Sequence, residues 1–156
     1  MTVKTPKLIV PTRGLDFGNG FYTTVNFEQA RRFAHNVLAR NNGMGIPTVS
    51  FFEIDLETAK KTFDIKEFER PDGEWLDFVC DNRLGKYAGP SYDIIIGPVA
   101  NDTVYRTFRQ YEHGDISRKE TIQRLKVSEL YNQIAFCTQR AVALLKFVKS
   151  EVVKNG

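Results

Sequence analysis

Apolar and polar residues alternate with two different periods along this 156-residue chain, and the two periods predict a mixture of helices and strands. Aromatic and β-branched runs predict strands at 8–10, 21–25, 48–56, 63–68, 92–99 and 133–137. Apolar residues at helical spacing predict helices at 27–40, 57–61, 71–85, 102–113, 117–127 and 138–148. The order of these elements does not follow a regular strand–helix–strand repeat. We therefore expect an α+β fold.

The helix at 27–40 has the clearest start and stop signals. Asn26 is a good N-cap, and Gln29 three residues later completes a capping-box pattern. Apolar residues then recur at helical spacing, and Asn-Asn-Gly at 41–43 ends the segment. This apolar stripe consists of Phe27, Ala30, Phe33 or Ala34, Val37 and Leu38.

Three further segments carry specific expectations. The run 92–99 is nearly all apolar, which is typical of a central strand that is covered on both faces. The segment 8–10 ends at Pro11 and is expected at a sheet edge. The segment 133–137 is expected to be the last strand, followed by a final amphipathic helix with Thr138 as its cap. Its inward residues would be Ala141, Leu144, Leu145 and Val148.

Composition narrows the class of protein without naming a function. The length and the lack of internal repeats or linkers favour one domain spanning 1–156. No apolar run reaches about 18 residues, so we expect no membrane span. The first residues lack the apolar stretch of a secretory signal, and there are 2 cysteines, so we expect a cytoplasmic protein. With 22 basic and 19 acidic residues mixed along the chain, a solvated helix face is favoured over a nucleic-acid patch.

Few residues indicate chemistry by themselves. Gly18-Asn19-Gly20 lacks the remaining residues of a phosphate-binding loop, and a strand follows it, so a turn is favoured. Cys80 lies in an apolar stripe and Trp75 has apolar neighbours, so both are expected in the core. Cys137 has no histidine near it in the sequence, and the 2 histidines of the chain leave little for a metal site. We expect no metal.

Three spaced motifs resemble a bacterial domain-of-unknown-function family that is grouped with the ADP-ribosyltransferase superfamily. They are DFGNGFYTT at 16–24, EWLDFV at 74–79 followed by NR at 82–83, and YDIIIGPVAND at 92–102. The segment YNQIAF at 131–136 is also similar to the closing strand of poly-ADP-ribose-polymerase-like domains. The resemblance runs from about residue 6 to 148, and it implies an ADP-ribosyltransferase-like split β-sheet with flanking helices.

The resemblance also implies an NAD site, with NAD as the substrate. Tyr22 matches the aromatic–hydroxyl motif, and its ring would stack on nicotinamide. Gln133 falls at the position of the catalytic glutamate, so Tyr22 and Gln133 are the candidate catalytic pair, on neighbouring strands of one cleft. Further contacts to NAD would come from Gly20, Phe21, Thr23, Arg13 and Arg83, of which the two arginines suit a pyrophosphate.

Two departures from the superfamily pattern affect the expected activity. Gln133 can donate a hydrogen bond but supplies no negative charge for an oxocarbenium-like transition state. No histidine precedes Tyr22, so either the sequence is shortened at its start or the protein lacks the first-strand His-Gly motif. The expectation is a toxin-like mono-ADP-ribosyltransferase with an unknown macromolecular target and a small neutralising partner protein. The alternatives are a non-catalytic NAD, ADP-ribose or protein-binding module on the same fold and, on charge alone, a nucleic-acid binder.

Overall fold

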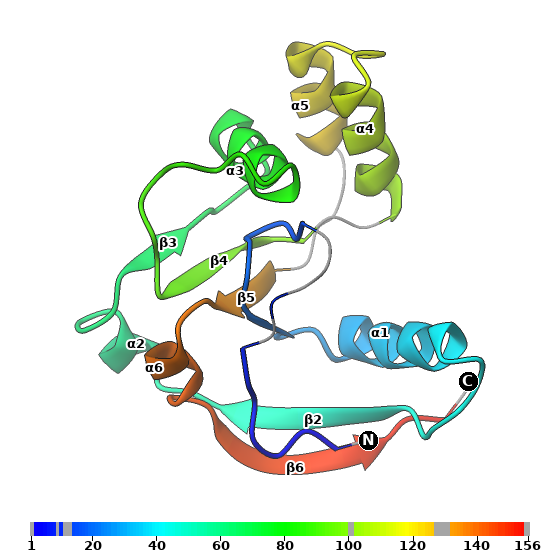
Figure 1. The fold of residues 1–156 in the computed structure, drawn as a ribbon, viewed down its shortest axis with the longest axis vertical. Helices are drawn as coiled ribbons and strands as arrows, with labels where there is room; N and C mark the ends of the chain where they lie inside the picture. The colour runs from blue at the N-terminus through cyan, green and yellow to red at the C-terminus, as the bar shows by residue number, and fades with distance from the viewer. Residues whose placement is uncertain (1, 9, 11–13, 100–101, 127–131, 155–156) are drawn as a thin grey trace.

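The computed structural model describes the chain except for residues 1, 9, 11–13, 100–101, 127–131 and 155–156 (Figure 1). Its strands are β1 (Phe21–Thr24), β2 (Thr48–Glu53), β3 (Ile65–Glu67), β4 (Ile94–Pro98), β5 (Asn132–Phe136) and β6 (Lys146–Val152). Its helices are α1 (Phe27–Arg40), α2 (Leu56–Ala59), α3 (Gly73–Arg83), α4 (Asp102–Glu112), α5 (Arg118–Lys126) and α6 (Gln139–Val142). The α+β class predicted from the sequence is confirmed.

The strands form two sheets. Four strands lie in the order β1-β5-β4-β3, with β3 and β4 parallel and the other pairs antiparallel. β2 and β6 form a separate antiparallel pair, with a bulge between Phe51 and Phe52. Helices α3, α4 and α5 lie on one side of the large sheet and the β2–β6 pair lies on the other side (Figure 1).

Strand β4 is covered on both faces, as its apolar sequence predicts. Its five residues are all buried, and alternate side chains enter two separate cores. Ile95 packs with Trp75 and Phe108 on the side of α3, α4 and α5. Ile94 packs with Phe136 in the other core. The expected core positions of Trp75 and Cys80 are therefore confirmed, and the indole Nε1 of Trp75 donates a 3.1 Å hydrogen bond to the Pro98 carbonyl.

Helix α1 begins and ends where the sequence predicts, but its cap is built differently. The Asn26 side chain accepts a hydrogen bond from the Gln29 N–H at 2.8 Å. The Gln29 side chain does not return to the Asn26 N–H, which donates to the Thr24 hydroxyl at 3.0 Å. That hydroxyl in turn donates to Gln29 Oε1 at 2.7 Å. Thr24 therefore completes the cap from the preceding strand.

The C-terminal segment differs from the prediction. The helix after Thr138 contains only Gln139–Val142, and the residues that follow Leu145 form β6 instead of continuing it. β5 is therefore not the last strand. The reason is tertiary: β6 pairs along its length with β2, and the Phe147 ring packs against Phe52 at 5.9 Å. Pairing and aromatic packing outweigh a helical spacing that the same residues also satisfy.

The strand predicted at 8–10 is also wrong where it can be assessed. Leu8 and Val10 belong to no strand, and Ile9 lies outside the described residues. Within the part of the chain that the structure describes, no helix combines the length and apolar character that a membrane crossing requires.

Candidate functional site

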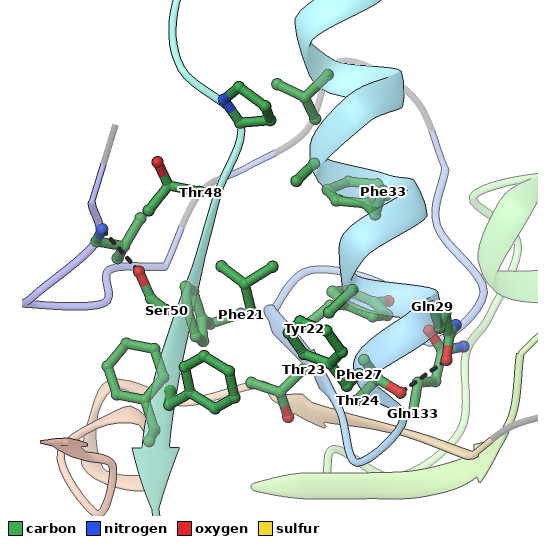
Figure 2. Close-up of a pocket in the computed structure, with 18 of the residues that line it drawn as sticks. Phe21, Tyr22, Thr23, Thr24, Phe27, Gln29, Phe33, Thr48, Ser50 and Gln133 are labelled. Atoms are coloured by element: carbon green, nitrogen blue, oxygen red, sulfur yellow. Dashed lines mark hydrogen bonds between the residues drawn. The ribbon is translucent and has the colours of Figure 1, made fainter. Parts of the chain in front are cut away.

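A groove of about 900 Å³ separates the two sheets beside α1. β1 and the Leu15–Asp16 segment border it on one side, β2 on another, and α1 closes it (Figure 2). The groove changes character along its length. One end is polar, and its lining includes Asp16, Tyr22, Thr24, Gln29 and Gln133. The remainder is lined mainly by apolar residues, many of them from α1 and β2, with Asn41, Thr48 and Ser50 as polar exceptions. The volume lies in the range typical of small-molecule sites.

Tyr22 and Gln133 lie on the same face of the large sheet. Strand β1 pairs with β5 so that Tyr22 is opposite Ala135 and Thr24 is opposite Gln133. Directly opposed residues share a face, and so do residues two positions apart on one strand. Both side chains line the groove, and Figure 2 shows Gln133 next to Thr24 and Gln29 at the base of α1. The structure therefore places Tyr22 and Gln133 on one face of the sheet, and both are among the residues that line the groove.

Asp16 supplies a negative charge beside Gln133. The Gln133 amide Nε2 donates to the Asp16 carboxylate at 3.4 Å, and this carboxylate also lies 3.7 Å from the Arg83 guanidinium. Gln133 is buried, and the Asp16 and Arg83 side chains are only 17% and 12% exposed. The guanidinium also lies over the Phe108 ring, at 5.4 Å. The three side chains form a largely desolvated polar cluster in which electrostatic interactions are strong.

The hydroxyl of Tyr22 holds the loop that carries Asp16. It accepts a hydrogen bond from the Phe17 N–H at 3.0 Å and donates one to the Gly18 carbonyl at 2.7 Å. The Tyr22 ring is stacked on Phe17, with the centroids 6.4 Å apart. Burial raises the pKa of Tyr22 well above its ordinary value, and the nearby Asp16 charge adds to this increase. Tyr22 therefore acts as a neutral hydroxyl that orders the loop.

Of the other residues predicted to contact NAD, some line the groove and others do not. Phe21 and Thr23 line the groove, although they point to the opposite face of β1 from Tyr22. Gly20 does not line the groove: a Cβ on Gly20 would lie 3.1 Å from the Phe136 carbonyl oxygen. Its lack of a side chain therefore serves the close approach of the chain to β5. Arg83 faces Asp16, and Arg13 lies outside the described residues.

Sequence reasoning missed Asp16 as a site residue. Its position directly before the Phe-Gly-Asn-Gly turn was visible, but its neighbour in space is 117 positions away. The pairing of β1 with β5 and the loop held by the Tyr22 hydroxyl bring the two together. The Thr24–Gln29 hydrogen bond at the groove was missed because Gln29 was assigned to a capping box alone.

The apolar stripe of α1 does not enter the core. None of the α1 residues is buried, and Phe33 is 59% exposed. Phe27, Phe33 and Val37 line the groove instead, and Figure 2 shows Phe33 on the side of α1 that faces β2. The Phe27 ring stacks on Phe51 of β2 at 5.9 Å, so the two elements touch at the N-terminal end of α1. The predicted helix with one apolar face therefore forms, and that face borders the groove.

Two acidic residues within the motifs at 74–79 and 92–102, Asp77 and Asp93, have structural partners. The Asp93 carboxylate accepts hydrogen bonds from the Thr138 hydroxyl, the Arg140 guanidinium and the Asp64 N–H. The Asp77 carboxylate forms a two-bond pair with Arg118 on the surface. These contacts connect elements and lie apart from the residues that line the groove.

The free cysteines do not resemble nucleophiles. Burial raises the pKa of the Cys80 thiol to about 12 and that of Cys137 to about 11. Among the residues whose placement is described, no group of three or more His, Cys, Asp and Glu side chains could hold a metal ion. The polar side chains that line the groove include the Asp16 carboxylate, the amides of Gln29 and Gln133, and hydroxyls.

Comparison with known proteins adds a family. No curated protein and no solved structure gives a significant match to the chain. A family model described as "Protein of unknown function (DUF3990)" matches residues 1–147, which include every element from β1 to α6 and the groove between them. The chain belongs to the DUF3990 family.

Proposed function

We propose that the protein is an NAD-dependent mono-ADP-ribosyltransferase that uses the polar end of the groove. The observation that supports this most strongly is the Asp16 carboxylate, which lies 3.4 Å from the Gln133 amide in the groove that Tyr22 also lines. The fold would be the split-sheet transferase fold without its first-strand motif. The two separate sheets with a groove between them are compatible with that fold.

The proposed reaction breaks the bond between C1′ of the ribose and the nicotinamide nitrogen. The bonding electrons leave with nicotinamide, and the ribose acquires oxocarbenium character until the acceptor nucleophile bonds to C1′ and loses its proton. A carboxylate held in a water-poor site stabilises that positive charge. Asp16 would provide the charge that Gln133 lacks, and Gln133 would hydrogen-bond the 2′-hydroxyl.

Arg83 sets a limit on this chemistry. Its guanidinium lies 3.7 Å from the Asp16 carboxylate and partly neutralises it. The carboxylate would therefore stabilise an oxocarbenium less than an unpaired glutamate does. This favours slow transfer of a single ADP-ribose over chain elongation. The acceptor would be a macromolecule, and the resemblance to toxin-like transferases further suggests a small neutralising partner protein. The small number of cysteines favours a cytoplasmic location.

The second candidate is a non-catalytic module that binds NAD or ADP-ribose. It is favoured by the contacts of Tyr22, whose hydroxyl is already engaged by Phe17 and Gly18 within the protein. A site whose polar groups serve loop structure can retain affinity for a nucleotide after its catalytic power has been lost. The two candidates differ in whether NAD is consumed.

Nicotinamide release from NAD by the purified chain tests the proposal. We expect slow release by the wild type and, with Asp16→Asn, a decrease on the order of 10²–10³-fold, typical of losing one positioned electrostatic group. Asp77→Asn is the matched control, because it removes the same charge from a surface pair. NAD binding without release by the wild type would favour the non-catalytic module. If the wild type neither binds NAD nor releases nicotinamide, both candidates are contradicted.

A further inference from the structure

We propose that the apolar part of the groove accepts an extended segment of a partner protein, which adds as a strand to the free edge of β2. The segment would have an apolar centre and acidic flanks. This inference rests on the main chain of β2, the apolar face of α1 and the charges of α1. It does not depend on the proposed NAD chemistry.

Two strand edges border the groove. Every residue from Met44 to Phe52 lines it in succession, as does every residue from Phe21 to Val25. A strand that presents a face contributes alternate residues, whereas an edge contributes consecutive ones. Within the described residues, β1 pairs only with β5 and β2 only with β6, so each has one unpaired edge.

The register identifies the main-chain groups of β2 that face the groove. The Val153 N–H donates to the Pro47 carbonyl at 2.9 Å, so the Pro47 main chain faces β6. In an antiparallel pair, residues bonded to the partner alternate with residues whose N–H and C=O point away. Thr48 and Ser50 are therefore the residues that offer main-chain donors and acceptors to the groove side.

The groove edge of β2 lacks the usual protection against strand addition. Natural edge strands carry charged side chains that discourage pairing. The outer strand β6 follows this rule with Lys146, Lys149 and Glu151. The groove lining from Met44 to Phe52 contains no charged residue. An uncharged edge inside an apolar groove is the arrangement by which proteins bind extended peptides through main-chain hydrogen bonds.

Helix α1 provides the apolar cover and the charge preference. Phe33, Val37, Met44 and Ile46 are all exposed large apolar residues that line the groove. α1 carries three arginines and one glutamate, a net charge of +2 if His is neutral. Apart from Asp16 at the polar end, the lining contains no ionisable acid or base except tyrosine. None of the charged residues of α1 lines the groove, so acidic residues on either side of an apolar strand would meet the net positive charge of α1 outside the lining.

A synthetic peptide tests this inference directly. The probe is a fluorescein-labelled peptide of about nine residues, with alternating valine and threonine in the centre and aspartates at both ends, long enough to span β2. Binding is measured by fluorescence anisotropy with the full chain. We expect saturable binding that weakens at least about tenfold when alternate peptide amides are N-methylated, because main-chain hydrogen bonds are lost. Lysine in place of the flanking aspartates should also weaken it.

The chain offers a matched pair of variants for the same assay. Ser50→Pro removes an N–H that faces the groove, whereas Ser150→Pro makes the same change at its partner position, on the outer edge of β6. We expect Ser50→Pro to weaken peptide binding at least about tenfold and Ser150→Pro to leave it unchanged. Circular dichroism establishes that both variants fold.

Phe33→Ser is a further variant for the peptide-binding assay, and it leaves the main chain of β2 unchanged. Phe33 is exposed in the free chain, so its replacement should preserve the fold and weaken peptide binding, with Asn36→Ser on the same helix as the control. The inference is overturned by no peptide binding, by equal effects of Ser50→Pro and Ser150→Pro, or by insensitivity to N-methylation. A groove-dependent dimer, detected by sedimentation and lost with Phe33→Ser, would also overturn it by assigning the groove to a second copy.

Discussion

The side-chain amide of Gln133 donates to the carboxylate of Asp16 across the polar end of the groove, at 3.4 Å. An amide at the position expected for a catalytic acid thus has a carboxylate as its direct neighbour. The charge that is absent at residue 133 is present at residue 16, on the loop that precedes β1. This pair is the basis for proposing chemistry at the groove.

Asp16→Asn should lower the free energy of unfolding by about 1–3 kcal/mol, because it removes the ion pair between Asp16 and the largely buried Arg83 guanidinium. Urea denaturation measures the change. Asp77→Asn is the control, since both members of the Asp77–Arg118 pair are about half exposed and water replaces the interaction. Equal losses in the two variants would show that the Asp16–Arg83 pair is not desolvated as described.

Tyr22→Phe should separate the roles of the ring and the hydroxyl. The variant keeps the stack on Phe17 but leaves the Phe17 N–H and the Gly18 carbonyl without their partner. We expect a loss of about 1–2 kcal/mol in unfolding free energy and faster hydrogen exchange at the Phe17 amide. Tyr22→Ala should in addition abolish any NAD cleavage. Unchanged exchange at Phe17 in Tyr22→Phe would contradict the loop-holding role.

Gly18→Ala should cost more stability than Gly85→Ala. Both glycines have positive φ, +75° and +67°, so backbone strain is similar. A Cβ on Gly18 would lie 2.8 Å from the Asn82 side-chain oxygen, whereas a Cβ on Gly85 would have no atom within 4 Å. We expect a loss of about 1 kcal/mol in Gly85→Ala and a larger one in Gly18→Ala, measured by urea denaturation. A larger loss in Gly85→Ala than in Gly18→Ala would contradict the close approach of Gly18 to Asn82.

Asp93 should make stability sensitive to strong acid. The hydrogen bond from Arg140, followed by those from Thr138 and the Asp64 N–H, holds the pKa of this buried carboxyl at about 2, below its ordinary value of 3.8. The contribution is complete above pH 3.8 and is lost as the pH falls to about 2, because the unfolded chain takes up the proton first. Asp93→Asn should therefore flatten the stability profile in this window.

At neutral pH the same variant should lose about 1–3 kcal/mol of unfolding free energy, because an amide accepts through one oxygen where the buried Asp93 carboxylate accepts through two. Urea denaturation between pH 2 and pH 5 follows both effects. Asp64→Asn serves as the comparison, since Asp64 contributes its main chain to this network. A profile for Asp93→Asn that parallels the wild type across the window would contradict the assignment.

Sequence patterns predicted the local elements well and their packing less well. The apolar run of β4 and the Asn26 N-cap of α1 are encoded within a few residues, and both were predicted. The residues after Thr138 also have helical spacing, but those from Lys146 onward form β6 because they pair with β2. Likewise, the α1 stripe shows a helix with one apolar face but cannot show that this face borders a groove.

The candidate site was half accessible from the sequence. Tyr22 and Gln133 were named from motifs, and the β1–β5 register places them on one face. Asp16 was not found, because no local pattern links it to a residue 117 positions away. The sequence predicted that Gly20 lets the main chain approach a ligand. In the structure, its lack of a side chain lets the main chain approach β5. Distant pairing and backbone proximity are properties of the folded chain.

The most direct test of the central claim is an NMR titration of the chain with NAD that follows the side-chain amide of Gln133 and the methyl groups of Thr23 and Thr24. All three side chains line the groove. The account predicts that their resonances shift together with one dissociation constant, while the resonances of Asp77 and Arg118 stay unchanged. Resonances at the groove that do not move at saturating NAD, or shifts confined to another surface, would contradict it.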